Sequence, residues 1–411
     1  MFGLKDKHYG IASCALRSLG RLCLGVLVAR RLGTDGYSLF VILIGTEVIV
    51  STFSNALYAQ PLLTMAPGLS HDERVALEGH ARRRVASFAG VVLVIGMVVA
   101  PLVGAVAQVS AWTLLLFISA TAAMVVADCS RAIRQGRFES QRTVVADLMA
   151  YGVPVTCLLM LGSDLVGMQT LMWGLVLVGQ LLAIRIMRIR RVSVRPEQET
   201  LRRYRELAVP FATGSAVVSL SSRTQPYVLG ALASTAQLSW FGCALSLMGP
   251  MRLLSGSLSS VLRPRLALQQ GHGDHVAQAR CLRQALVLQL ALGATLFVTT
   301  VLGGSWLARL VFGDAFEGVG ALLPVAVIFA MLEGIGAIQT VAAQTRSTNG
   351  ARLATRARTL AGSVGLILLA CLCPLAGASG ALWALVAAET VFLWRLLLPA
   401  VQVMNRVRSI P

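Results

Sequence analysis

Charged side chains are scarce in this sequence of 411 residues, and acidic ones are scarcer than basic ones. Only 13% of the residues are charged, with 18 acidic against 36 basic, whereas 56% are hydrophobic. Soluble globular domains contain roughly 25% charged and 45–50% apolar residues. Because a water-soluble fold has no place for so much apolar surface, the composition excludes an ordinary soluble protein.

Clusters of metal-binding or catalytic residues are also missing from the sequence. The eight cysteines form no Cys-x-x-Cys pair, and most lie in apolar segments, where a thiol behaves as a small apolar side chain. His71, His80, His272 and His275 fall in polar segments that we expect to be solvated loops. We therefore expect no metal, no cofactor, no catalytic residue and no enzyme activity.

What the sequence has instead is a series of apolar stretches of about 20 residues, each long enough to cross a hydrocarbon core of roughly 30 Å. Within lipid these stretches must be helices, since irregular backbone would leave amide groups unpaired. We expect an all-α, polytopic membrane protein of about 12 transmembrane helices. The expected helices lie at residues 9–29, 38–60, 86–107, 111–131, 143–163, 168–187, 208–230, 238–262, 284–304, 318–340, 358–377 and 379–404.

Basic residues gather on one side of the expected membrane. By these boundaries, about 28 of the 36 lysines and arginines lie in the termini or in loops after even-numbered helices. Loops on the opposite side contain Arg30, Arg31 and Arg309. The positive-inside rule therefore places both termini in the cytoplasm. The net charge of +18 is spread over short loops, which favours contact with anionic membrane lipids and argues against nucleic-acid binding.

The longest strongly charged segment, residues 185–206, divides the expected helices six and six. Within it, Glu197 and Glu199 follow Pro196 and would stabilise the N-terminus of a short surface helix. We therefore expect an N-terminal six-helix lobe at residues 1–190 and a C-terminal six-helix lobe at residues 208–411. A cytoplasmic amphipathic linker at residues 191–207 would join them.

The two halves share a weak internal similarity. Residues 28–40 align with residues 229–241 with one insertion, and in both a helix ends in a turn of small residues before an aromatic pair begins the next helix. Because each half has an even number of spans, the repeats would be parallel and related by an axis along the membrane normal. A central cavity between two six-helix lobes is the geometry expected from such repeats.

Two motifs resemble those of a known family. Leu32-Gly33-Thr34-Asp35-Gly36-Tyr37-Ser38-Leu39-Phe40 is similar to the turn that opens the second helix of Wzx-type polysaccharide and O-antigen flippases. Leu310-Val311-Phe312-Gly313-Asp314-Ala315-Phe316, continuing to Pro324, is similar to their loop before the tenth helix. These flippases belong to the multidrug/oligosaccharidyl-lipid/polysaccharide (MOP) superfamily, and the resemblance covers essentially the whole chain in helix number and order.

The resemblance implies a MATE-like fold and a specific activity. The protein would be a flippase in the bacterial inner membrane that moves an undecaprenyl-pyrophosphate oligosaccharide, by alternating access, for O-antigen or exopolysaccharide assembly. Its expected partners are this lipid-linked substrate, the membrane lipids, and polysaccharide polymerase and chain-length machinery.

Three other functions are weighed against this one. A cation-coupled multidrug exporter of the MATE type would be expected to have acidic residues dominating its cavity, whereas arginine predominates here. A flippase for a peptidoglycan precursor is less favoured, because such proteins commonly have additional helices. A membrane-embedded polysaccharide polymerase or glycosyltransferase usually needs a large extracytoplasmic loop, and no loop on that side exceeds about fifteen residues by the expected boundaries.

Arginines within the expected helices are the candidate substrate-binding residues, because a charged side chain at the bilayer centre costs roughly 2.5–3.5 kcal/mol on insertion scales. Arg17 and Arg21 are four residues apart and therefore share one face of the first helix, and the repeat alignment brings Arg223 close to the position equivalent to Arg21. Arg252 and Arg395 complete the set. Guanidinium groups suit a pyrophosphate, being always charged and bidentate. The alternative is that they form ion pairs between helices or extend to the membrane interface.

Carboxylates within the expected helices are the candidates for ion coupling. Glu47, Glu333 and Glu389 lie in apolar surroundings. Burial favours the protonated form of a carboxyl group, and a neighbouring arginine favours the ionised form. A conformational change that alters this balance could exchange a proton for substrate. In the alternative reading, the three glutamates are fixed partners of the arginines.

Overall fold

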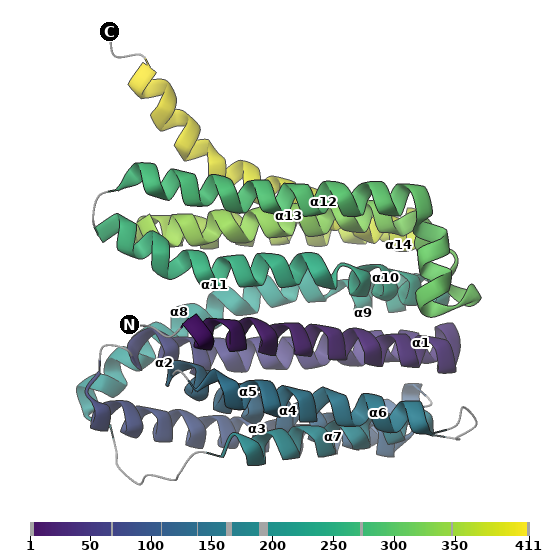
Figure 1. Cartoon of the computed structure of the whole chain (residues 1–411). Helices are drawn as coiled ribbons and strands as arrows, with labels where there is room; N and C mark the ends of the chain where they lie inside the picture. The colour runs from purple at the N-terminus through teal and green to yellow at the C-terminus, as the bar shows by residue number, and fades with distance from the viewer. Residues whose placement is uncertain are drawn as a thin grey trace. The chain divides into compact units, whose positions relative to one another are not determined.

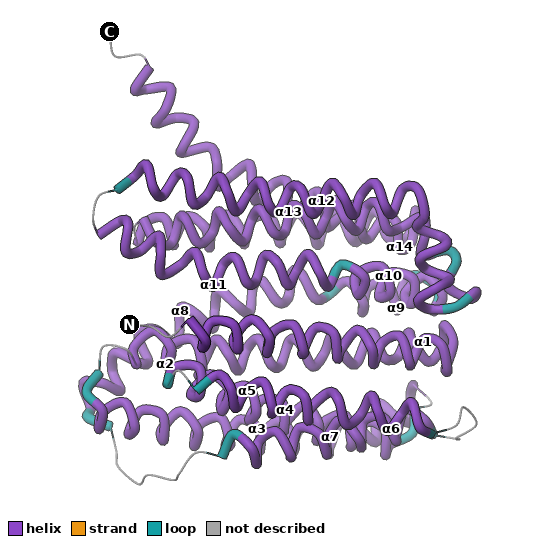
Figure 2. Tube along the Cα trace, in the orientation of Figure 1, coloured by secondary structure: helices purple, strands orange, loops and turns teal. Residues whose placement is uncertain are grey.

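A computed structural model describes residues 4–66, 69–107, 109–137, 139–161, 167–188, 196–271, 274–346 and 348–408. Throughout these ranges the regular structure is helical, with loops and turns between helices and no strand (Figure 2). The all-α fold class expected from the sequence is therefore confirmed. The chain divides into two compact units, which are described separately.

Unit 1 comprises residues 1–31 and 43–219. It begins with most of helix α1 and ends within helix α8, both labelled in Figure 1. It also contains two short π-helices, η1 and η3. Its elements are α1 (Leu4–Ser54), η1 (Asn55–Ala59), α2 (Gln60–Met65), α3 (His71–Ala107), α4 (Ala111–Gly136), α5 (Ser140–Asp147), η3 (Leu148–Gly152), α6 (Val153–Met160), α7 (Met168–Ile186) and the greater part of α8 (Gln198–Arg223).

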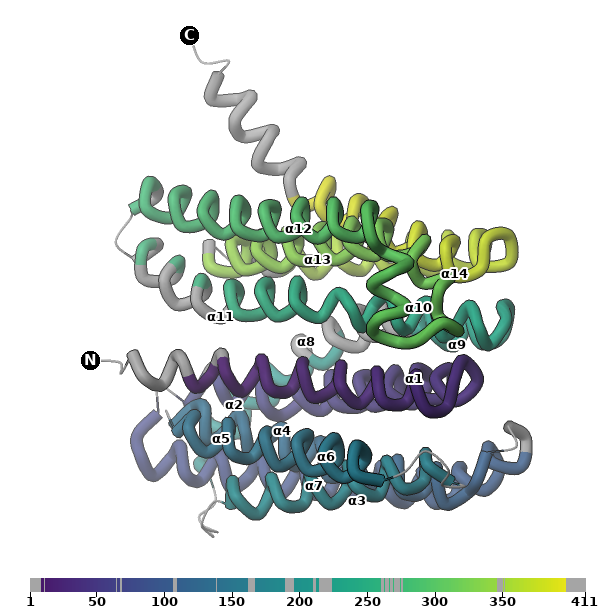
Figure 3. The backbone as a smooth tube through the Cα atoms, turned by 45° about the vertical axis from the view of Figure 1, so that its right-hand side comes forward, coloured from purple at the N-terminus to yellow at the C-terminus, as the bar shows by residue number. Residues whose placement is uncertain are grey.

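Unit 2 comprises residues 32–42 and 220–411. In this unit α13 packs lengthwise against both α12 and α14 (Figures 1 and 3). Its elements after α8 are α9 (Gln225–Leu232), α10 (Thr235–Leu247), α11 (Gly249–Gly271), α12 (His275–Phe312), η4 (Asp314–Phe316), α13 (Val319–Arg346) and α14 (Thr348–Arg408).

Two glycines separate expected helices that otherwise run together. Gly33 within α1 has φ +65°, and Gly377 within α14 has φ +52°. Glycine adopts these conformations without the steric penalty that a β-carbon would bring. Gly33 therefore lies between the first and second expected helices, and Gly377 is the last residue of the eleventh, just before the twelfth.

Eight helical stretches among the described residues are long and apolar enough to cross a membrane. Two of them, Ala12–Leu63 and Arg352–Leu396, each contain two of the expected helices. The seventh and eighth expected helices are absent from this set. In the structure they are broken into α8 with α9 and α10 with α11, and polar residues such as Arg223, Gln225 and Arg252 interrupt their apolar runs.

Helix α3 begins earlier than the sequence analysis expected. Residues 71–85, which include His71 and His80, were predicted to precede the helix, but they form its first turns. Ser70 and Glu73 make a capping box: the Ser70 amide and hydroxyl donate to the Glu73 carboxylate at 3.1 and 2.7 Å. This Ser-x-x-Glu spacing is a signal of helix initiation that can be recognised in the sequence.

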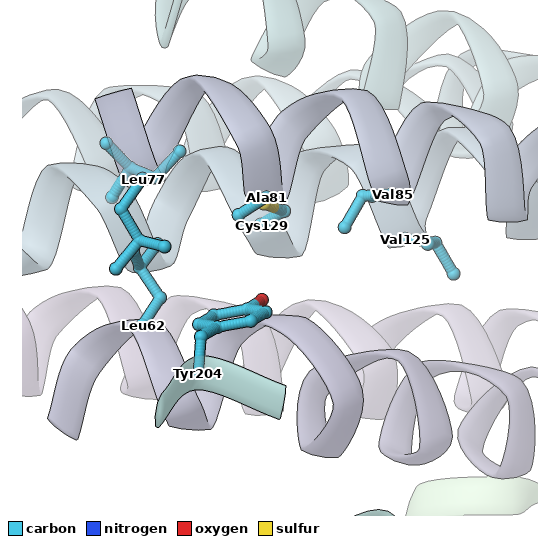
Figure 4. Packing of buried hydrophobic residues seen from close by; sticks show 8 residues of the cluster. Leu62, Leu77, Ala81, Val85, Val125, Cys129 and Tyr204 are labelled. Atoms are coloured by element: carbon cyan, nitrogen blue, oxygen red, sulfur yellow. The ribbon is translucent and has the colours of Figure 1, made fainter. Parts of the chain in front are cut away.

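The start of α8 is anchored to the core of unit 1 by Tyr204. Its ring lies in a cluster with Leu62 of α2, Leu77 of α3 and Cys129 of α4 (Figure 4). Its hydroxyl donates to the Tyr58 carbonyl, in the π-helix η1, at 3.0 Å. Burial raises the pKa of the Tyr204 phenol above its usual value. The first turns of α8, which the sequence analysis assigned to the linker, are therefore firmly attached to unit 1.

The motifs on which the family resemblance depends meet inside unit 2. Tyr37 is fully buried, with its ring centroid 5.8 Å from that of Phe316 and 6.3 Å from that of Phe312. Its hydroxyl lies 3.2 Å from the Ser246 hydroxyl. Residues 32–42 are thus part of unit 2, although the residues before and after them belong to unit 1.

Candidate functional site

Two arginines on one face of α1 are paired with carboxylates in unit 1. The Arg17 Nη2 donates to Asp128 Oδ1 at 3.1 Å, which links α1 to α4. The Arg21 Nη2 donates to both oxygens of Glu47 at 2.8 and 3.0 Å. The four-residue spacing that placed the arginines on one face therefore positions them against two different carboxylates.

Asp128 belongs to a longer chain of buried polar contacts. It also accepts hydrogen bonds from Ser51, at 2.7 Å, and from Arg131 on its own helix. Arg131 Nε in turn donates to Asp147 at 3.1 Å, and Asp147 accepts a further hydrogen bond from Ser13. The network connects α1, α4 and α5 through charged groups that would be costly to bury singly.

The two π-helices of unit 1 begin within one helical turn after members of this network. Ser51 lies one turn before η1, and Asp147 is the last residue of α5 before η3. Two glycines let neighbouring helices approach η3: Gly20 of α1 lies against Tyr151, and a β-carbon at Gly179 of α7 would lie 2.7 Å from the Ala150 carbonyl oxygen. π-Helical turns within α-helices are frequent at functional sites.

Side-chain exposure distinguishes Arg17 and Arg21 from Arg131. The side chains of Arg17 and Arg21 are 28% and 34% exposed, whereas that of Arg131 is 5% exposed. Glu47 and Asp147 are fully buried. The side chains of Arg17 and Arg21 are therefore partly exposed, while Arg131 is enclosed by protein.

Unit 2 contains two further arginine–carboxylate pairs. Arg252 of α11 donates to Glu333 of α13 at 3.0 Å. Arg358 and Glu389 pair between the two parts of α14 on either side of Gly377, and the Arg358 guanidinium stacks 3.7 Å from the centroid of the Phe392 ring. Such a cation–π contact adds an attraction that does not depend on the carboxylate.

Most of the predicted site residues thus occur as pairs. Arg17, Arg21 and Arg252 each form an ion pair with a carboxylate. Glu47, Glu333 and Glu389 each form an ion pair with an arginine. Arg395 is exposed. Arg223 is the last residue of α8, and its side chain lies outside the described residues. The roles assigned to these residues in substrate binding and ion coupling remain predictions.

Two members of the pairs were missed in the sequence analysis. Arg131 and Arg358 were placed at the ends of predicted helices, where a charge carries little cost. Helix α4 instead continues to Gly136, and α14 begins at Thr348, so both arginines lie within helices. The spacing of Asp128 and Arg131, three residues apart on one helix, was the available signal of an ion pair.

Comparison with known proteins gives similarities only at the level of structure. No protein-family model matches the chain, and no curated protein matches its sequence. The lipid II flippase MurJ, in an inward closed conformation, is similar with a TM-score of 0.76 and 13% sequence identity, over 95% of this chain and 87% of that chain. An inward-facing multidrug resistance MATE transporter of the MOP superfamily is similar with a TM-score of 0.70 and 12% identity, over 96% of each chain.

A eukaryotic MATE transporter is similar as well, with a TM-score of 0.67 and 13% identity, over 97% of this chain and 95% of that chain. The chain therefore has the fold that MurJ shares with the MATE transporters of the MOP superfamily. At 12–13% identity this likeness concerns the fold alone.

Proposed function

We propose that the chain is a flippase that moves an undecaprenyl-pyrophosphate oligosaccharide across the bacterial inner membrane for surface polysaccharide assembly. The observation that carries the proposal is the partly exposed pair Arg17 and Arg21, four residues apart in an apolar helix of this fold. A charge so placed normally faces a wet cavity or a partner group rather than lipid. No covalent step is needed, so the proposal includes no catalytic residue.

The two arginines retain hydrogen-bonding capacity for a phosphate ligand. In the described residues, each donates to its carboxylate through Nη2. A planar guanidinium with remaining N–H groups can bind two phosphate oxygens at once, which an ammonium group cannot do as readily.

Two related functions differ from this one in the substrate. The fold is shared with multidrug MATE transporters, but the acidic groups Glu47, Asp128 and Glu389 are all paired with arginines here, which weakens their attraction for a cationic drug. The fold is also shared with a lipid II flippase. A lipid-linked peptidoglycan precursor presents the same pyrophosphate to the arginines and differs in its glycan.

A flipping assay with purified protein in liposomes tests the proposal. Fluorescent undecaprenyl-pyrophosphate oligosaccharide, fluorescent lipid II and the cationic drug ethidium are compared as substrates. We expect movement of the oligosaccharide-linked lipid and no protein-dependent movement of ethidium. Transport of ethidium alone would contradict the proposal and indicate drug export. Movement of lipid II alone would indicate a peptidoglycan precursor as the substrate in place of a polysaccharide oligosaccharide.

A further inference from the structure

Three arginines gather where the first turns of α8 lie against α3 in unit 1. They are Arg83 and Arg84 of α3 and Arg205 of α8, and all three residues are exposed. The charge of each one acts on His80 of α3. The His80 ring lies edge-on to the ring of Tyr204, the residue that anchors α8, with 6.2 Å between the ring centroids. Positive charges from two helices are therefore concentrated around one side chain.

Acidic residues of the same region have other partners or lie farther away. The ion pairs that involve them are Glu78 with Arg137, Glu139 with Arg134, Glu199 with Arg202 and Arg203, and Glu206 with Arg202. Glu73 belongs to the capping box of α3. Asp72 and Glu197 lie near the starts of α3 and α8, about 12 Å or more along the helix axes from the three arginines. Arg74 and Arg82 of α3 add positive charge. Among the described residues the three arginines form no ion pair, so their charge is available to an outside anion.

An apolar face continues from the arginines along α3. Phe88, Val91 and Ile95 follow Arg84 by four, seven and eleven residues and therefore lie on the same face of the helix. The Phe88 ring packs against Phe53 of α1, with 6.4 Å between the ring centroids. Val91 and Ile95 are 52% and 58% exposed. The charged surface thus adjoins an exposed apolar one, which is the arrangement that an amphipathic ligand requires.

The length of α3 places these arginines near the membrane surface. Its 37 residues span about 55 Å at 1.5 Å per residue, against a hydrocarbon core of roughly 30 Å. The apolar stretch of this helix ends at Ala105. Arg84 lies about 32 Å before Ala105 along the helix axis, so it reaches the level of the lipid head groups when Ala105 lies at the opposite boundary of the core.

We infer that Arg83, Arg84 and Arg205 bind the phosphate of an anionic glycerophospholipid, such as phosphatidylglycerol, with an acyl chain along the apolar face of α3. A guanidinium group can bind two phosphate oxygens at once, and basic residues beside a membrane helix attract anionic lipids. A zwitterionic lipid is disfavoured, because it brings its own positive charge to the arginines. The bound phosphate links α3 to α8. This site involves neither Arg17 nor Arg21 and is therefore independent of the proposed function.

Native mass spectrometry of the full chain tests the inference. The delipidated protein in detergent is equilibrated with phosphatidylglycerol and phosphatidylcholine of the same chain length, and the bound lipid is counted. We expect phosphatidylglycerol to bind in preference, and Arg83→Ala/Arg84→Ala to weaken its tightest site at least about tenfold, because hydrogen bonds from two charged groups are lost. The matched control is Arg202→Ala/Arg203→Ala, which removes two exposed arginines that already pair with Glu199 and should keep the affinity of the unsubstituted chain.

Thermal unfolding in detergent separates a lost lipid site from a damaged fold. Without anionic lipid, the two double variants should have the same midpoint, and added phosphatidylglycerol should raise the midpoint in the control alone. Equal affinity for phosphatidylglycerol in the two variants would overturn the inference, as would equal affinity of the unsubstituted chain for the two lipids. Glycerophosphoglycerol, which is the same head group without acyl chains, should bind far more weakly than the lipid, and equally tight binding would contradict a role for the apolar face. Each of these contrary results leaves the proposed function standing.

Discussion

Arg17 and Arg131 both donate to Asp128, yet they differ in what else they touch. Arg131 is enclosed, and it also holds Asp147, so it neutralises two carboxylates at once. Arg17 donates from a more exposed position on α1. Within one network, Arg131 therefore neutralises two buried carboxylates, whereas Arg17 is partly exposed, and ligand binding by Arg17 is a prediction.

Replacement of Arg131 by alanine should destabilise the protein severely. It leaves Asp128 and Asp147 buried with less compensation, and breaking a buried pair in this way costs about 3–5 kcal/mol. The thermal unfolding midpoint in detergent measures the effect. The control is Arg202→Ala, since Arg202 is 68% exposed and its surface pair with Glu199 should contribute little to stability. Equal midpoints for the two variants would contradict the buried network.

Junctions between two helical parts of one long helix depend on individual glycines, and Gly377 within α14 gives the clearest case. Its φ of +52° joins the two parts of α14, and a β-carbon there would also collide with the Gln237 side chain. Gly377→Ala should therefore lower stability by about 1–2 kcal/mol or more. Gly90→Ala in α3 is the control, because nothing lies within 4 Å of its β-carbon position.

The same detergent unfolding measurement compares these two glycine variants. In the interior of a helix, alanine is preferred to glycine by about 0.5–1 kcal/mol, so Gly90→Ala should leave stability unchanged or increase it. A Gly377→Ala protein with the midpoint of Gly90→Ala would show that the turn does not require a left-handed conformation.

The existence of the helices could be predicted from the sequence, because runs of about 20 apolar residues leave no other structure possible in lipid. Interruptions of the helices were harder to predict. The apolar pattern did not predict the π-helices η1 and η3. In η1 the Tyr58 carbonyl accepts a hydrogen bond from Tyr204, a tertiary contact between residues 146 positions apart. The first turns of α3 were missed because hydropathy does not register the capping box of Ser70 and Glu73.

The candidate site could be predicted in part. Charged residues within apolar runs identified Arg17, Arg21 and Arg252 and the glutamates at 47, 333 and 389. Their pairing could not be derived, since Arg17 and Asp128 are 111 residues apart and only tertiary packing brings them together. Arginine–carboxylate pairs were the alternative to a ligand role, and in the structure Arg17 and Arg21 are both paired with carboxylates and partly exposed. Their role in substrate binding stays a prediction.

For the molecule as a whole, the fold is shared by proteins that differ in what they transport, so the fold alone does not identify the substrate. The substrate must be inferred from the charges that the membrane-spanning helices contain. In the described parts of the two units, four arginines inside the helices are paired with carboxylates: Arg17, Arg21, Arg252 and Arg358. The proposal of an anionic substrate therefore rests on the partly exposed arginines Arg17 and Arg21.

The most direct test of this account is the flipping rate per unit of folded protein in the double variant Arg17→Ala/Arg21→Ala. Arg202→Ala/Arg203→Ala is the matched control, since it removes two arginines from the exposed first turns of α8. Each hydrogen bond to a charged group contributes about 1.5–3 kcal/mol, so we predict at least a tenfold loss of lipid-linked oligosaccharide flipping in the first variant and none in the second. Equal rates for the folded forms of both variants would contradict the proposal that these arginines bind the substrate.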